Sequence, residues 1–161
     1  MGRLRPDFLG MTRMKRFLML ASVVAILFSV SPAIAQIAPV RQDRVQQAWQ
    51  EVYKAVPELP LENQYVSRET GNVDPNNTLI TRLIRYHYFI KGRPVNFRLD
   101  WKYTLADYLG INEPMQAEGY PGSDNLRKNP FESDRAIIQK LNRRQRDAIV
   151  QALVNAFTRP Q

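Results

Sequence analysis

The chain of 161 residues contains no cysteine and a single histidine, His87. Without cysteine it forms no disulfide, carries no lipid anchor on a cysteine and has no thiol nucleophile. A zinc or copper site needs cysteines, several histidines or both, so one histidine excludes the usual ligand sets of these metals. We therefore expect neither a metal nor another cofactor.

The sequence also lacks the short motifs of several large enzyme classes. It has no GxxxxGK[ST] or GxGxxG phosphate-binding loop and no GxSxG nucleophile elbow. A Ser–His–acid arrangement would depend on His87, which the helical pattern places on or beside an apolar face. We therefore expect a protein that is not an enzyme.

A pair of carboxylates is a further way to build a catalytic site, because glycoside hydrolases act with two acids. Asp100 and Asp107 lie seven residues apart and share one side of a short predicted helix. A helix cap and a solvated helix face explain these two acids better. A cell-envelope hydrolase is accordingly kept only as an alternative function.

Long apolar runs are scarce as well, and the longest, residues 17–30, has 14 residues. A helix that crosses a bilayer needs about 20 residues, so this run is short for a membrane anchor. Lys15 and Arg16 precede it and an Ala-Ile-Ala sequence ending at Ala35 follows it. This order of a basic start, an apolar run and small residues is typical of an export signal peptide.

We predict that residues 1–35 are a signal peptide, that cleavage falls between Ala35 and Gln36, and that Met14 can be the functional start. Residues 36–161 are of the usual size for a single domain. The alternative is an uncleaved N-terminal membrane anchor, in which the small residues extend the apolar helix.

Part of the positive charge of the chain belongs to this leader. Of 23 basic and 15 acidic residues, five basic and one acidic lie within residues 1–35. The remaining 18 basic and 14 acidic residues give residues 36–161 a net charge of +4. Such a mild excess lacks the dense basic stripe that phosphate backbones require, so we expect no nucleic-acid partner. An acidic protein or an anionic membrane surface fits this charge better.

The first half of the domain predicts two helices. Residues 42–56 carry apolar side chains at helical spacing, and Pro57 ends this segment. Asp74 and Pro75 predict the start of a second helix, because aspartate caps a helix and proline suits its first position. Gly92 supplies the left-handed residue that ends it.

The second half of the domain predicts three shorter or capped helices. Residues 101–109 follow helical spacing with Asp100 as the N-cap and Gly110 as the stop, and residues 110–132 form a loop. Ser133 caps a short helix, and Asn142 begins a last helix with a capping-box pattern. These segments predict a small all-α fold, an irregular array of four to five helices.

Seven of the 13 aromatic residues of the domain fall between residues 82 and 108, among arginines and lysines. Aromatic residues and arginine are enriched at the centres of protein interfaces, because they bury a large area at little entropic cost. One helix cannot turn all of these side chains inward, so we expect part of the cluster to be exposed. The alternative is that the aromatic residues are core and the arginines a solvated face. The predicted partner-binding residues are Arg82, Arg85, Tyr86, His87, Tyr88, Arg93, Trp101 and Tyr103.

A second basic group lies at the start of the last predicted helix. It consists of Arg143, Arg144 and Arg146. Cations are slightly unfavourable at a helix N-terminus, which favours an external anion as their partner. These three residues are the predicted anion-binding group.

Three stretches of the chain carry a resemblance to known proteins. They are residues 61–110, LENQYVSRETGNVDPNNTLITRLIRYHYFIKGRPVNFRLDWKYTLADYLG, residues 120–130, YPGSDNLRKNP, and residues 141–157, LNRRQRDAIVQALVNAF. The chain resembles a group of small exported proteins of cyanobacteria. The resemblance implies a location in the periplasm or the thylakoid lumen, and no catalytic or ligand-binding residues come with it.

The functional expectation is a non-enzymatic accessory protein that binds a protein partner, such as a membrane complex, through the aromatic and arginine residues of 82–108. The first alternative is a peripheral protein that binds anionic lipid through the basic group. The second alternative is the hydrolase with paired carboxylates.

Overall fold

The computed structural model describes residues 42–159. The predicted signal peptide, its cleavage position and the alternative membrane anchor lie outside these residues. The described residues all belong to one compact unit. Within them, no helix has both the length and the apolar character needed to cross a bilayer.

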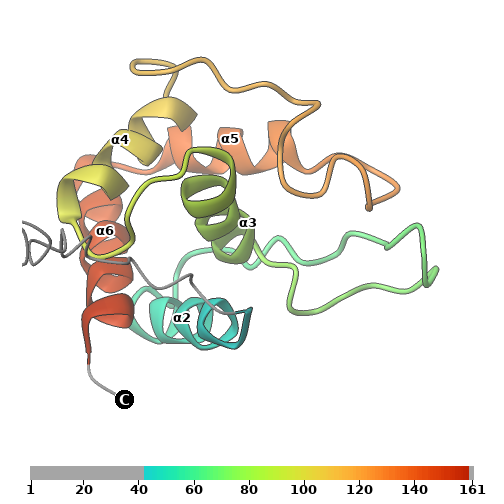
Figure 1. The fold of residues 1–161 in the computed structure, drawn as a ribbon, viewed down its shortest axis with the longest axis horizontal. Coiled ribbons are helices and arrows are strands. Elements are labelled where there is room, and N and C mark those ends of the chain that lie inside the picture. The colour runs from blue at the N-terminus through green and yellow to red at the C-terminus, as the bar shows by residue number, and fades with distance from the viewer. Residues whose placement is uncertain (1–41, 160–161) are drawn as a thin grey trace, which may run out of the picture. The chain divides into compact units, whose positions relative to one another are not determined.

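Helices form the framework of the described chain (Figure 1). They are α2 (Gln42–Ala55), α3 (Leu79–Arg85), the π-helix η1 (Tyr86–Ile90), α4 (Arg98–Tyr108), α5 (Phe131–Lys140) and α6 (Arg143–Thr158). Residues 42–159 contain no extended sheet, and their strand pairing is limited to isolated bridges such as Val66 with Val73. The predicted small all-α fold is confirmed.

Helix α2 packs along α6 through the face that the sequence predicts. Val45, Ala48 and Val52 are buried on α2, and Leu153 and Ala156 are buried on α6. Burial of a valine or leucine side chain contributes about 1.5–3 kcal/mol, so this contact is a main source of stability.

The second helix begins later than predicted. Thr78 is the N-cap of α3, and its hydroxyl oxygen accepts a hydrogen bond from the Thr81 amide at 3.1 Å. Asp74 instead closes a turn, in which its carboxylate accepts the Asn76 amide at 2.9 Å. Aspartate stabilises such turns as readily as helix caps, and the prediction of a helix start at Asp74 and Pro75 was wrong for this reason.

The same helix widens into a π-turn before it ends. The Lys91 amide donates to the Tyr86 carbonyl at 3.0 Å, a bond across five residues. The extra residue in this turn changes the direction in which the following side chains point, and π-turns are frequent at functional sites. Phe89 and Ile90 are 53% and 52% exposed. Gly92 then takes φ of 60° and ends the helix as predicted.

Two further predicted helix starts were wrong. Helix α4 begins at Arg98 after Phe97, so Asp100 lies in the first turn, where a negative charge suits the helix dipole. Helix α5 begins at Phe131, and Ser133 lies inside its first turn. The Ser133 hydroxyl donates to Glu62 at 2.8 Å and thereby joins α5 to a distant loop. Tertiary contacts of this kind cannot be read from local spacing.

Helix α6 begins as predicted, with a complete capping box. The Asn142 carboxamide oxygen accepts the Gln145 amide at 3.0 Å, and the Gln145 side chain accepts the Asn142 amide at 2.9 Å. Two backbone N–H groups that the helix leaves unpaired are satisfied in this way.

We expect the substitution Asn142→Ala to lower the free energy of unfolding by about 1 kcal/mol, because it leaves an N-terminal amide of α6 without its acceptor. Urea denaturation measures this change. The matched control is Gln151→Ala, which alters an exposed residue in the middle of α6 and should stay within about 0.5 kcal/mol of wild type. Equal losses in the two variants would contradict the role of the cap.

Candidate functional site

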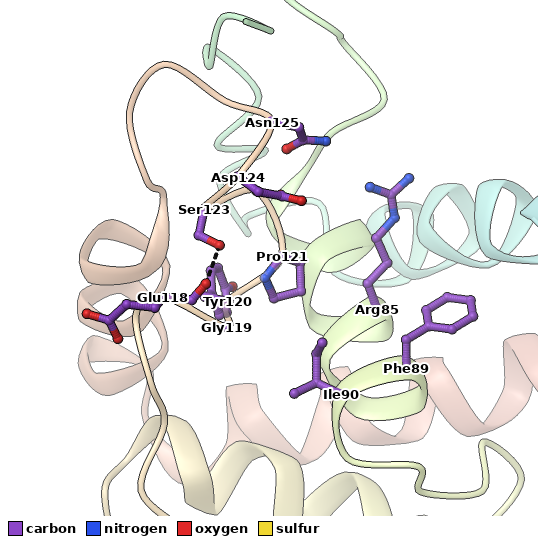
Figure 2. A pocket seen from close by; sticks show the side chains of 11 residues that line it. Arg85, Phe89, Ile90, Glu118, Gly119, Tyr120, Pro121, Ser123, Asp124 and Asn125 are labelled. Atoms are coloured by element: carbon purple, nitrogen blue, oxygen red, sulfur yellow. Dashed lines mark hydrogen bonds between the residues drawn. The ribbon is translucent and has the colours of Figure 1, made fainter. Parts of the chain in front are cut away.

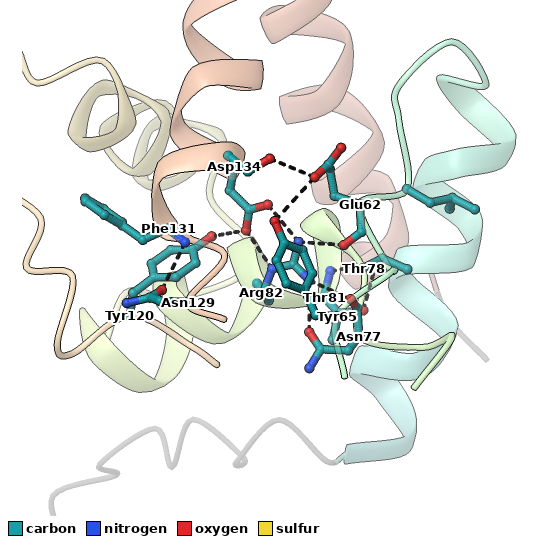
Figure 3. A network of polar contacts seen from close by, with 12 residues as sticks. Glu62, Tyr65, Asn77, Thr78, Thr81, Arg82, Tyr120, Asn129, Phe131 and Asp134 are labelled. Carbon is teal, nitrogen blue, oxygen red and sulfur yellow. Dashed lines mark hydrogen bonds and ion pairs between the residues drawn. The ribbon is translucent and has the colours of Figure 1, made fainter. Parts of the chain in front are cut away.

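Arg82, a predicted partner-binding residue, lies fully buried at the centre of a polar network (Figure 3). Its Nε and Nη2 donate to the two carboxylate oxygens of Asp134 at 2.6 and 2.7 Å. Nη1 donates to the carbonyl and the side chain of Asn77 at 2.5 and 3.0 Å, and Nη2 also donates to the Glu62 carbonyl at 2.8 Å. All five guanidinium N–H groups are thus satisfied within the protein.

The tyrosines of the loop and of α4 extend this network. The Tyr120 hydroxyl donates to Asp134 at 2.6 Å and lies 2.7 Å from the Tyr108 hydroxyl, which therefore donates to it. Burial raises the pKa of Tyr120 well above its ordinary value, so this hydroxyl stays protonated. The Arg82 guanidinium also lies 5.0 Å from the ring centroid of Tyr65. The ion pair between Arg82 and Asp134 therefore links α3 and α5 to the loops that carry Glu62 and Tyr120.

Glu62 is held in an unusual conformation by the same network. It has φ of 48°, a left-handed conformation that costs a non-glycine residue on the order of 1 kcal/mol or more. Its carbonyl accepts from Arg82 and its carboxylate accepts from Ser133. Both contacts fix the segment between α2 and α3 against α5.

His87 and Trp101, two more predicted partner-binding residues, are stacked inside the protein. Their ring centroids are 3.6 Å apart and both side chains are fully buried. His87 Nε2 lies 3.1 Å from the Pro94 carbonyl and must carry the proton, so Nδ1 accepts from the Thr104 hydroxyl at 2.8 Å. Burial lowers the pKa of His87 to about 4. The ring is neutral near pH 7 and both nitrogens are engaged, so His87 has no free nitrogen to act as a general base.

Asp107 is a structural carboxylate. Arg93 donates to its Oδ2 at 2.6 Å, while the Asn112 side chain and the Glu113 amide donate to its Oδ1 at 2.7 and 3.0 Å. Burial by itself raises the pKa of Asp107, but the hydrogen bonds from Arg93, Asn112 and Glu113 together hold it below its ordinary value. Asp107 is buried, so the expectation of a solvated helix face was wrong, and its saturated contacts do not suit the acid of a hydrolase.

The predicted partner-binding set therefore divides by exposure. Arg82, Tyr86, His87 and Trp101 are buried, and their assignment to a surface was wrong because each completes an internal hydrogen bond or stack. Arg93 is largely buried and paired with Asp107 and Glu113. The remaining residues with exposed or partly exposed side chains are Arg85, Tyr88 and Tyr103.

Arg85 borders a groove that the sequence does not indicate (Figure 2). The groove has a volume of about 360 Å³ and lies between the end of the second helix and the loop of residues 118–125. Arg85, Phe89 and Ile90 form one wall, and the loop forms the other. The loop lacks any helical pattern, so spacing arguments could not place its residues across the groove from the second helix.

Hydrogen bonds and a glycine conformation define the loop wall. The Ser123 hydroxyl donates to the Glu118 carbonyl at 2.6 Å, and the Arg127 amide donates to the Val66 carbonyl at 2.9 Å. Gly122 has φ of 103°, and a Cβ there would lie only 2.7 Å from a methyl group of Leu126. A larger residue at this position would therefore displace the loop. Gly122 is a local signal in the sequence that could have pointed to a fixed loop.

The predicted anion-binding arginines lie beside α4. A second hollow of about 300 Å³ is lined by Arg143 and Arg146 from α6 and by Lys102 and Leu109 from α4 and its end. The Arg143 side chain is 90% exposed, Arg144 is exposed, and one Arg146 nitrogen donates to the Leu141 carbonyl. The structure brings Arg143 and Arg146 together with Lys102 of α4, whereas Arg144 does not line this hollow.

No protein-family model, curated protein or solved structure matches this chain. Among residues 42–159, no three side chains of the metal-binding types come together as a ligand set would. The class that the observations define is a small all-α protein with an exposed groove and a basic surface.

We expect the contribution of His87 to the free energy of unfolding to fall by about 2 kcal/mol when the pH is lowered from about 7 to about 5. The pKa of His87 is about 4 in the folded protein, and the ordinary value of 6.5 applies to the unfolded chain. As the pH falls, the unfolded chain therefore binds the proton before the folded protein does. The stability that neutral His87 contributes is fully present above the pKa of the unfolded chain. It is lost as the pH falls toward the pKa of the folded protein. Urea denaturation at a series of pH values measures this loss.

The variant His87→Gln isolates this contribution, because His87 is the only histidine of the chain. Its stability should be lower near pH 7 and should change less between about pH 7 and about pH 5 than that of wild type. Parallel profiles for the two proteins would show that His87 is not responsible.

Proposed function

We propose that this protein is a non-enzymatic accessory protein that binds an extended segment of a protein partner in the groove beside Arg85. The segment presents an apolar side chain next to a carboxylate. The observation that carries this proposal is the position of Arg85 beside Phe89 and Ile90 at the rim of a preformed hollow (Figure 2).

Apolar contact is the first element of the proposal. Phe89 and Ile90 are each about half exposed although neighbouring side chains of the same helix are buried. The Tyr88 ring lies edge-on to Phe89, with centroids 4.9 Å apart, and so holds the phenyl ring in place. A large aromatic side chain that is already ordered loses little entropy when a partner covers it.

Charge is the second element. The Arg85 guanidinium has no hydrogen bond or ion pair within residues 42–159, in contrast to the fully hydrogen-bonded guanidinium of Arg82 one turn earlier. A guanidinium binds a carboxylate in a bidentate geometry, which adds direction as well as affinity. Asp124 and Asn125 lie across the groove and can accept or donate hydrogen bonds to the backbone of a bound segment.

The place of action is part of the same proposal. The basic start, the apolar run and the small residues up to Ala35 support export. We therefore place the partner at a membrane complex in the periplasm or the thylakoid lumen.

We expect Phe89→Asp to weaken partner binding by about tenfold to a hundredfold, because it removes the apolar anchor and repels the carboxylate. Affinity capture from membranes of the native organism, followed by titration of the captured partner, measures this loss. The matched control is Phe97→Asp, since Phe97 is exposed to the same extent, 55% against 53%, but does not line the groove.

A photoreactive phenylalanine analogue at position 89 identifies what lies in the groove. The crosslinked peptide should belong to the captured partner and contain an acidic residue or its C-terminus. Retention of the partner by Phe89→Asp, or crosslinks from position 97 but not from position 89, would contradict the proposal.

A further inference from the structure

A second surface, separate from the groove, gathers basic residues from α4 and α6. Asp147 of α6 lies 3.6 Å from Arg98, 3.5 Å from Lys102 and 3.9 Å from Arg143. One carboxylate thus forms ion pairs with three cations. The side chains of Arg98, Lys102 and Arg143 are 50%, 44% and 90% exposed. We call the surface of Arg98, Lys102, Arg143 and Arg146 the basic face.

These long ion pairs leave the basic face with unneutralised charge. Distances of 3.5–3.9 Å exceed those of charge-assisted hydrogen bonds, so Asp147 holds none of its partners tightly. The Asp107 carboxylate, which lies 2.6 Å from Arg93, shows what a tight pair looks like in the same protein. The basic face therefore attracts anions over a distance of about 10 Å, the screening length in moderate salt.

Exposed apolar side chains accompany the charges. Leu99 and Tyr103 lie one turn apart on α4 and are 59% and 45% exposed. Leu99 and Tyr103 directly follow Arg98 and Lys102 in the sequence, so each lies about 100° around the helix from the preceding cation. Ile111 is 76% exposed and lines the hollow next to Arg143. Exposed aliphatic and tyrosine side chains therefore lie next to the cations along α4, and Ile111 shares a hollow with Lys102, Arg143 and Arg146.

We propose that the basic face docks on an anionic lipid bilayer. Clustered Lys and Arg side chains bind the phosphates of anionic headgroups, and their aliphatic stems can lie along the membrane surface. Leu99 and Ile111 insert into the interfacial region, and Tyr103 lies at headgroup level, where tyrosine is enriched. This surface uses no residue of the groove, so the inference stands independently of the proposed partner site.

Sedimentation of the purified protein with vesicles tests this inference. The protein should bind vesicles of phosphatidylcholine mixed with phosphatidylglycerol and should not bind phosphatidylcholine alone, and raising the salt concentration should weaken binding. Soluble glycerol phosphate should not compete, because docking needs both charge and an apolar phase. Equal sedimentation with both kinds of vesicle, or none with either, would overturn the proposal.

Charge reversal locates the surface. The triple variant Arg98→Glu, Lys102→Glu and Arg143→Glu should lose about a hundredfold or more in vesicle affinity. The matched control reverses Lys54, Arg127 and Lys128, which are exposed elsewhere on the protein, and should bind more tightly than the first variant by at least about tenfold. Equal losses in the two triple variants would show that only net charge matters and would overturn the assignment.

The apolar contribution has its own variant. Ile111→Ser leaves every charge in place and should weaken vesicle binding by about tenfold, an effect that persists when salt is raised. Circular dichroism confirms that each variant keeps its helices. Unchanged binding by Ile111→Ser would show that the protein does not insert into the bilayer, contrary to the proposal.

Discussion

The buried ion pair between Arg82 and Asp134 is the interaction on which the rest of the structure depends. It joins α3 to α5, and through Asn77, Glu62 and Tyr120 it also fixes the loops on either side. A buried pair contributes little net stability compared with apolar residues of similar size, but removal of one partner alone is strongly destabilising. The pair matters here for geometry, because residues 42–159 contain no extended sheet and the sequence has no cysteine for a disulfide, so few other contacts hold the long loops in one position.

The groove is a consequence of this arrangement. Tyr120 lines the groove and donates its hydroxyl to Asp134, so the loop wall is tied to the ion pair. The opposite wall consists of Arg85 and of two residues of the π-helix η1, Phe89 and Ile90, which are exposed. The buried ion pair between Arg82 and Asp134 thus helps to determine the position of the loop that borders the groove.

The sequence predicts the helices of this fold well and their starting residues poorly. The apolar stripe of α2 and the reciprocal Asn142 and Gln145 cap of α6 are local patterns, and both are confirmed. Asp74 and Ser133 have the chemistry of helix caps, but a turn and the tertiary contact with Glu62 use them instead. Local preferences of about 1 kcal/mol are too small to decide between such alternatives.

The sequence also predicts the candidate partner-binding residues only in part. Aromatic and arginine residues between 82 and 108 indicate an unusual region, yet their order along the chain does not separate Arg82, which has every donor satisfied, from Arg85. Burial of a guanidinium requires partners from distant segments, and Asp134 lies 52 positions away. The π-turn changes the side-chain direction within a few residues, so helical spacing misplaces the residues after Tyr86.

Amide hydrogen exchange in the double variant Arg82→Met and Asp134→Leu tests the organising role of the pair most directly. Apolar replacement keeps the core filled, so the α6 amide of Leu153 should retain its protection. The amides of Leu126 and Arg127, which donate to Gly122 and Val66, should lose most of theirs. Unchanged protection at Leu126 and Arg127 would contradict the account, because the loop would then be held without the ion pair.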